Sequence, residues 1–153
     1  MKDPANPTVP SWTPSPTVKA KNAVQRNVTA LLDELAPEKV LKRADQIRGP
    51  VEQHRTPNGC VLQGASAAVS VSWFADPVDE AVLGELHVIV WSGTVTHRGQ
   101  PKSRVGATVV SDHVLRPIEP PINDCVWLAV DGKKYDTASL AAKCLSLLAD
   151  QSR

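Results

Sequence analysis

The sequence lacks the features that mark membrane-spanning, secreted or strongly charged proteins. No apolar stretch is long enough to cross a bilayer. The N-terminal segment MKDPANPTVPSWTPSP has no apolar core ahead of a cleavage site, so it does not resemble a secretory signal. The formal net charge is only +1, from 17 basic and 16 acidic residues, which predicts no overall attraction to nucleic acid or to a membrane surface. We therefore expect a cytoplasmic protein without membrane contact.

The motifs of common catalytic and cofactor sites are also missing. There is no glycine-rich phosphate loop, no G-x-S-x-G and no H-E-x-x-H. Acidic residues gather between positions 76 and 85, but their spacing does not match a calcium loop. The sequence thus predicts neither a cofactor nor a metal ion, and it favours a protein that is not an enzyme.

Cysteine is scarce: Cys60, Cys125 and Cys144 are far apart, with no C-x-x-C and no neighbouring histidine pair. This spacing argues against a zinc knuckle, and the odd number argues against a disulfide framework. We expect three reduced thiols, of which at least two pack as small hydrophobic side chains.

Proline, in contrast, is concentrated at the N-terminus, where residues 1–18 hold five of the 13 prolines. Proline removes a backbone donor and pushes the preceding residue out of the helical region, so we expect a flexible leader. Trp12 has two interpretations. It either rests loosely on the domain, or it anchors a docking peptide in a pocket of a neighbouring chain.

Residues 19–153 are predicted to form a single α+β domain. Apolar residues at helical spacing predict a helix that begins at Lys19, with Val24, Val28, Leu31, Leu32 and Leu35 on its buried face. A second helix is expected from Pro37 to the stop at Gly49-Pro50. A last helix is capped by Asp136 or Thr137, and its buried stripe is Leu140, Cys144, Leu147 and Leu148.

Between these helices the apolar pattern changes to a period of two, which is typical of strands. Strands are expected over residues 65–73, 85–97, 104–115 and 125–130, with a short return over 133–135. Because no helix separates them, we predict an antiparallel meander of four to five strands, with the C-terminal helix packed on the sheet.

The main candidate site follows from the alternation of side chains between the two faces of a strand. His87, Ile89, Trp91 and Val95 share one face of the second predicted strand. Suppose that each pair of residues across the second and third strands has numbers that sum to an even value near 200. His113 then lies beside or diagonal to His87, and Asp112 lies on the opposite face. Two imidazoles and an indole on one face predict either a ligand pocket or a general base. The alternative is an ordinary half-exposed surface or the lining of a subunit interface.

A second candidate is the hairpin tip between these two strands, where Arg98, Lys102 and Arg104 gather positive charge. Such a tip can contact phosphates, but charges there also keep a sheet edge soluble. No aromatic residues alternate with these charges, as they do in proteins that bind single strands.

Three functions remain open at this point. The leading hypothesis is a non-enzymatic interaction or assembly domain that forms a homo-oligomer, or binds a protein partner, through a sheet face containing Ile89, Trp91 and Val95. The second is a small-molecule-binding domain, or an enzyme with a weak signature, whose pocket is lined by His87, Trp91 and His113. The third is nucleic-acid binding through residues 98–104.

Overall fold

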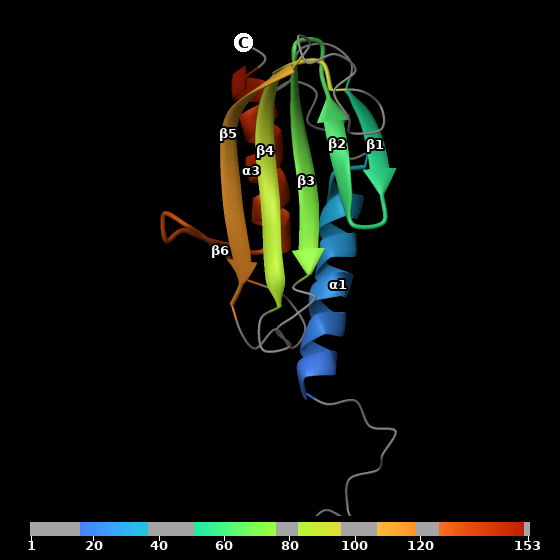
Figure 1. The fold of residues 1–153 in the computed structure, drawn as a ribbon, viewed down its shortest axis with the longest axis vertical. Coiled ribbons are helices and arrows are strands. Elements are labelled where there is room, and N and C mark those ends of the chain that lie inside the picture. Colours follow the sequence, from blue (N-terminus) through green and yellow to red (C-terminus); the bar gives the residue numbers. More distant parts are fainter. Residues whose placement is uncertain (1–15, 37–50, 76–82, 96–106, 119–125, 152–153) are drawn as a thin grey trace, which may run out of the picture.

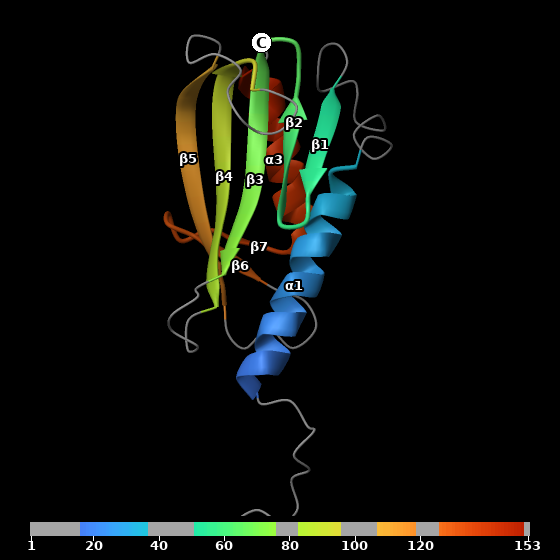
Figure 2. The same cartoon turned by 45° about the vertical axis from the view of Figure 1, so that its right-hand side comes forward.

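A computed structural model describes residues 16–36, 51–75, 83–95, 107–118 and 126–151. Their centre is a seven-stranded antiparallel sheet in which every strand pairs with its neighbour in the sequence, in the order β1-β2-β3-β4-β5-β6-β7. Both described helices lie on one face of the sheet (Figures 1 and 2). The predicted α+β class and antiparallel meander are therefore confirmed.

The elements have the following bounds. The helices are α1 (Pro16–Glu34) and α3 (Thr137–Gln151), and the strands are β1 (Glu52–Thr56), β2 (Gly59–Gln63), β3 (Ala67–Ala75), β4 (Gly84–Gly93), β5 (Ala107–Pro117), β6 (Trp127–Ala129) and β7 (Lys134–Tyr135). Within the described residues there are two helices; the predicted second helix, over 37–49, lies outside them.

The prediction of four to five strands was wrong, because it missed the β1–β2 hairpin. The turn at Pro57-Asn58-Gly59 was expected, but the strand before it, EQHRT, is wholly polar and has no apolar alternation. Contacts with the end of α1 stabilise β1 instead. Gln53 donates through Nε2 to the carbonyl oxygens of Leu32 and Leu35, at 3.3 and 2.8 Å, and so satisfies carbonyls at the end of the helix.

The predicted buried face of α1 is confirmed: Val24, Val28, Leu31, Leu32 and Leu35 are all buried. The helix begins at Pro16, within the last three residues of the predicted leader, as suits a residue that favours the first helical turn. Buried Asn27 links α1 to α3, because its Oδ1 accepts a hydrogen bond from Thr137 Oγ1 at 3.3 Å.

Asp136 is the residue that caps α3, one of the two predicted. Its Oδ1 accepts from the Ser139 N–H at 2.7 Å, and the Asp136 N–H donates to Ser139 Oγ at 3.0 Å. These reciprocal bonds form a capping box. The hydrogen bonds from Ser139 also lower the pKa of the Asp136 carboxyl.

The main core lies between the two helices and the sheet. It contains Cys60 and Cys144, two reduced thiols that pack as small hydrophobic residues as predicted, and the Trp73–Trp127 pair in an edge-to-face contact at 5.8 Å. Cys125 lies outside the described residues. A smaller cluster of Val61, Ala68 and Val95 lies away from this core, at the end of β4.

Candidate functional site

The register between β4 and β5 decides which of the predicted site residues meet. Trp91 pairs with Val109, as expected for numbers that sum to 200. A bulge after Val90 then adds one residue to β5, so that Val88 pairs with His113 and Ile89 pairs with Asp112. The predicted pairing of His87 with His113 was therefore wrong, because a shift of one residue moves every following side chain to the other face.

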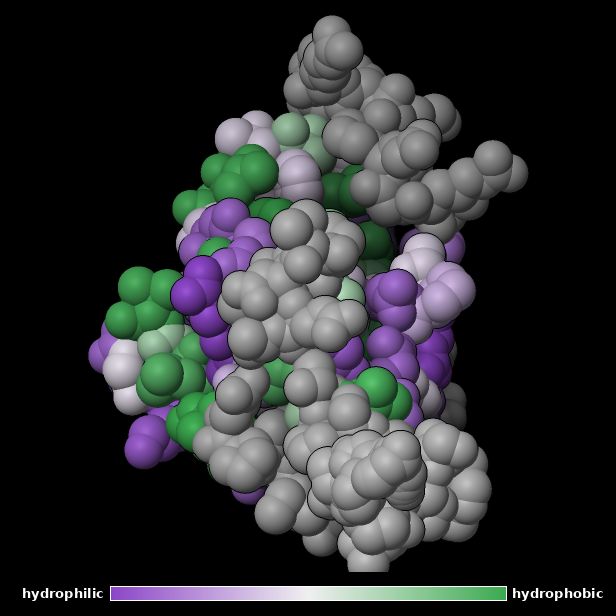
Figure 3. Space-filling model, turned by 60° about the horizontal axis from the view of Figure 1, so that its bottom comes forward, coloured by the Kyte–Doolittle hydropathy of each residue, from purple (hydrophilic) through white to green (hydrophobic). Residues whose placement is uncertain are grey.

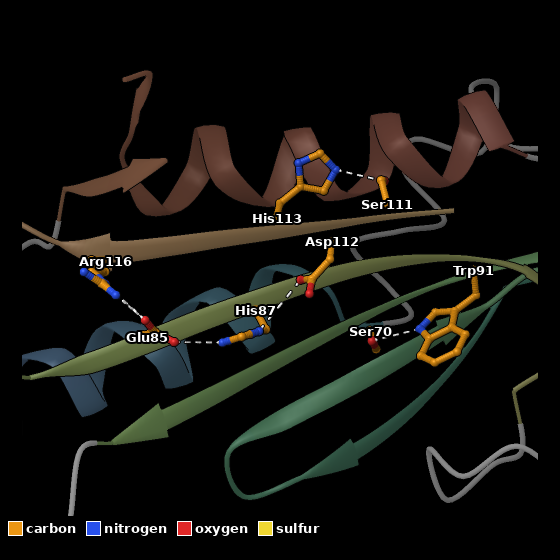
Figure 4. A network of polar contacts seen from close by, with 8 residues as sticks. All are labelled: Ser70, Glu85, His87, Trp91, Ser111, Asp112, His113 and Arg116. Carbon is orange, nitrogen blue, oxygen red and sulfur yellow. Dashed lines mark hydrogen bonds and ion pairs between the residues drawn. The ribbon is translucent and has the colours of Figure 1, made fainter. Parts of the chain in front are cut away.

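His87 and His113 occupy opposite faces of the sheet. His113 lines a groove against α3, together with Leu140 and Cys144, and its Nε2 lies 3.0 Å from Ser111 Oγ. His87 lies on the face that the helices do not cover, which we call the open face (Figure 4). A single pocket lined by both histidines and Trp91 is excluded by this arrangement.

On the open face, His87 belongs to a chain of polar side chains that includes Glu85, Asp112 and Arg116. Its Nε2 lies 3.1 Å from Glu85 Oε1, and its Nδ1 lies 3.8 Å from Asp112 Oδ1. Arg116 extends the chain by donating through Nε and Nη2 to the other oxygen of Glu85 (Figure 4). Asp112, which was predicted to lie on the opposite face, reaches this network because of the same bulge. The Phe74 ring packs edge-on against His87 at 5.1 Å.

This arrangement suits a structural network better than a catalytic one. Ser72 on β3 pairs with His87 on β4. Both ring nitrogens of His87 face carboxylates, so neither nitrogen points at the Ser72 hydroxyl. A general base needs one nitrogen within reach of the proton that it removes. The network instead fixes the His87 ring and places charges of both signs in a row on the open face.

The pKa of the Glu85 carboxyl is lowered from its usual value, first because Arg116 donates hydrogen bonds to it and second because His87 does so. Because the pKa of Glu85 is lower in the folded than in the unfolded chain, its ionised carboxylate stabilises the fold at pH values above the unfolded pKa. This stabilisation is lost as the pH falls through the folded pKa. Since Arg116 is largely solvent-exposed and Glu85 is partly exposed, the contribution to stability is small.

We predict that Arg116→Gln raises the pKa of Glu85 toward 4.5, because the substitution removes the group that lowers it most. The side-chain carboxyl resonance of Glu85, followed by NMR as the pH is changed, measures this directly. Arg55→Gln is the matched control, since Arg55 Nη1 pairs with Asp33 at 2.7 Å and does not belong to the network. An unchanged Glu85 pKa in Arg116→Gln, or an equal rise in the control, contradicts this assignment.

Apolar side chains surround the network on the open face. Phe74 is 56% exposed, Val109 51% and Leu128 38%, while Ile89 and Trp91 are partly buried. The Trp91 indole N–H donates to Ser70 Oγ at 3.0 Å and is thereby held against the sheet. A hollow of about 640 Å³ lies beside Ile89 and Trp91 and extends to His54, Ser70 and Ser72.

Val95 does not belong to this exposed set, contrary to prediction. It is only 2% exposed, because the segment after β4 folds back and packs it against Val61 and Ala68. Gln63 holds this segment: its Oε1 accepts from the Val95 N–H at 2.8 Å and its Nε2 donates to the Gly93 carbonyl at 3.1 Å. The chain itself therefore covers Val95 and one end of the open face.

Other open-face residues were not singled out from the sequence. Glu85 could have been found, because it lies two positions before His87 on the same strand. Arg116 and Leu128 could not, since their placement depends on the bulge and on the short pairing of β5 with β6. Trp12, Arg98, Lys102 and Arg104 lie outside the described residues.

No protein-family model, curated protein or solved structure matches this chain. In the described part of the chain, no three histidine, cysteine, aspartate or glutamate residues form a group that could hold a metal ion. None of the described helices has the length and apolar character needed to cross a membrane. The site must therefore be interpreted from its own geometry.

Proposed function

We propose that this chain is an assembly domain, and that a second copy of the same chain covers the open face of its sheet. The observation that carries this proposal is the one-sided arrangement of the helices (Figures 1 and 2). It leaves Phe74, Val109 and Leu128 exposed on the face that also carries Ile89 and Trp91. Exposed apolar side chains that gather on one face in this way are typical of a protein interface.

Charge favours a second copy as the occupant. In a two-fold interface the same patch meets itself, so a patch with charges of one sign repels its counterpart. The open face carries Glu85 and Asp112 but also Arg116, with His87 between them. Acidic and basic groups of two copies can therefore face each other across a two-fold axis.

The dimensions of the face are also suitable. Five strands at about 4.8 Å spacing and about eight residues at roughly 3.3 Å each give a plane of roughly 600 Å². Side chains increase the accessible area above that value, toward the roughly 800 Å² per partner of a standard interface. The small side chains of Ser70 and Ser72 near the centre allow a second sheet to approach closely.

The described surface that is seen in Figure 3 is mixed in character. Seen from the end where α1 begins, hydrophobic residues on the described surface lie directly beside hydrophilic ones (Figure 3). Mixed surfaces of this kind are usual for interfaces, which are about as apolar as the rest of a protein surface outside their buried centre.

We predict that Ile89→Arg weakens self-association about a hundredfold or more, since it replaces an apolar side chain near the middle of the proposed interface with a charged one. Ile89 lies between Ser70 on β3 and Asp112 on β5. Sedimentation velocity over a range of protein concentrations measures the change. Phe74→Ser is a milder second variant, because the exposed Phe74 side chain is not needed for the core.

Ser146→Arg is the matched control: it introduces the same charge on an exposed position of α3, on the other side of the sheet. Circular dichroism melting verifies that all variants fold. If the wild type associates and both open-face variants associate equally well, the interface lies elsewhere and the proposal is wrong.

A further inference from the structure

A second binding feature lies on the opposite side of the sheet from the open face. It is a groove of about 360 Å³ between β5, α3 and the β6–β7 hairpin. This volume lies at the lower end of the roughly 300–1,000 Å³ that is usual for small-molecule sites. Because the groove faces α3, it does not depend on the proposed assembly through the open face.

The groove exists because β6 is short. It pairs only with Leu115, Arg116 and Pro117 at the end of β5, so the described sheet does not continue beside His113. The helix α3 passes behind this uncovered part of β5, as Figure 4 shows for His113. The space between strand and helix therefore opens at the sheet edge.

The walls of the groove are apolar, and their inner ends belong to the main core. Val88, Leu115 and Leu140 are almost fully buried, and Leu147 lies near the surface. Such a surface binds a hydrocarbon group because the ligand removes more apolar area from water.

Two side chains with basic groups also line the groove. The partly buried side chains of Lys143, on α3, and His113, on β5, both line it. The Nε2 of His113 is 3.0 Å from Ser111 Oγ, which restrains the ring. A cation beside an apolar wall is the arrangement that recognises a negatively charged head group on an apolar body.

Two acidic residues also line the groove, but both carboxylates have other partners. Asp131 Oδ1 accepts from the Lys133 N–H at 2.9 Å within the β6–β7 turn. Asp112 points to the open face, where Oδ1 lies 3.8 Å from His87 Nδ1. Lys143 is the permanent positive charge among the described residues that line the groove.

We propose that this groove binds an apolar carboxylate, with its hydrocarbon chain against Leu115, Leu140 and Leu147 and its carboxylate at Lys143. His113 borders the same head-group position and can donate a hydrogen bond to it. This proposal adds a ligand to the chain and leaves the assembly function unchanged.

The test uses decanoate as the probe, titrated into the full-length protein. Isothermal titration calorimetry gives the affinity, and amide chemical-shift changes locate the site. We expect saturable binding with the shifts confined to α3, the second half of β5, the β6–β7 hairpin and the neighbourhood of Val88. Decanol and decyltrimethylammonium are expected to bind at least about tenfold more weakly than decanoate, because they lack the negative charge that Lys143 recognises.

Lys143→Gln is expected to weaken decanoate binding about tenfold, while Lys133→Gln, at the exposed β6–β7 turn, leaves it unchanged. Leu147→Trp fills the groove and should abolish binding without removing a core side chain. The proposal is overturned if decanoate does not bind, if its shifts map to the open face, or if decanol binds equally well. Equal affinity in Lys143→Gln and wild type also overturns it.

Discussion

In the folded protein, Cys60 and Cys144 are expected to resist alkylation almost completely. Burial raises the pKa of each thiol from 9.0 to about 12, against the weaker lowering influence of Arg55 on Cys60 and of Lys143 on Cys144. This rise in pKa lowers the ionised fraction of each thiol at neutral pH about a thousandfold, and the thiolate is the reactive form. Because burial also blocks the reagent, the loss of reactivity exceeds this factor.

Iodoacetamide labelling followed by mass spectrometry measures this protection. The experiment uses a Cys125→Ser background, because Cys125 lies outside the described residues. The unfolded protein in guanidinium chloride is the control, in which both thiols should react fully. Rapid labelling of either thiol under native conditions contradicts the burial of Cys60 and Cys144 in the main core.

The second large effect is expected for Gly84→Ala, at the start of β4. Gly84 has a φ of +130°, which L side chains rarely adopt, and an added Cβ would lie 2.3 Å from the Phe74 carbonyl oxygen and 2.9 Å from Ala75 Cα. Backbone atoms of a paired strand cannot move aside without breaking the ladder. We expect a loss of about 3 kcal/mol or more in the free energy of unfolding, from strain and overpacking together.

Gly132→Ala separates these two causes. Gly132 also has a positive φ, +89°, but nothing lies within 4 Å of an added Cβ. We therefore expect a loss of only about 1 kcal/mol, from conformational strain alone. Urea denaturation of both variants measures the difference, and equal losses would show that Gly84 is not closely packed against β3.

The elements that could be predicted are those whose own side chains specify them. The buried stripe of α1 and the alternation of Val69, Val71 and Trp73 in β3 require no knowledge of their neighbours, because helices and strands have fixed periods. The strand β1 could not be found in this way. Its polar residues are held by the end of α1, through Gln53 and Arg55, and this contact joins segments far apart in the sequence.

The candidate site was predictable only in part, for a related reason. Alternation places His87, Ile89 and Trp91 on one face, and this holds because all three belong to β4. Which residues of β5 join them depends on the bulge after Val90, which no local pattern in the sequence indicates. One inserted residue exchanges His113 for Asp112 and so replaces a pair of imidazoles with an imidazole between two carboxylates.

Together these features give the two sides of the sheet different roles. The side facing α1 and α3 contains the core and the groove that we assign to an apolar carboxylate. The open face contains a charged network with exposed apolar residues around it, and it is the surface that we assign to a second copy of the chain. Substitutions on one side should therefore leave the property of the other side unaffected.

The most direct test of the central proposal is the mass of the wild-type protein in solution, measured by sedimentation equilibrium over a range of protein concentrations. The proposal predicts a mass twice that of one chain at micromolar concentration, falling toward the mass of one chain in Ile89→Arg. A wild-type protein that keeps the mass of a single chain at the highest concentration would contradict it.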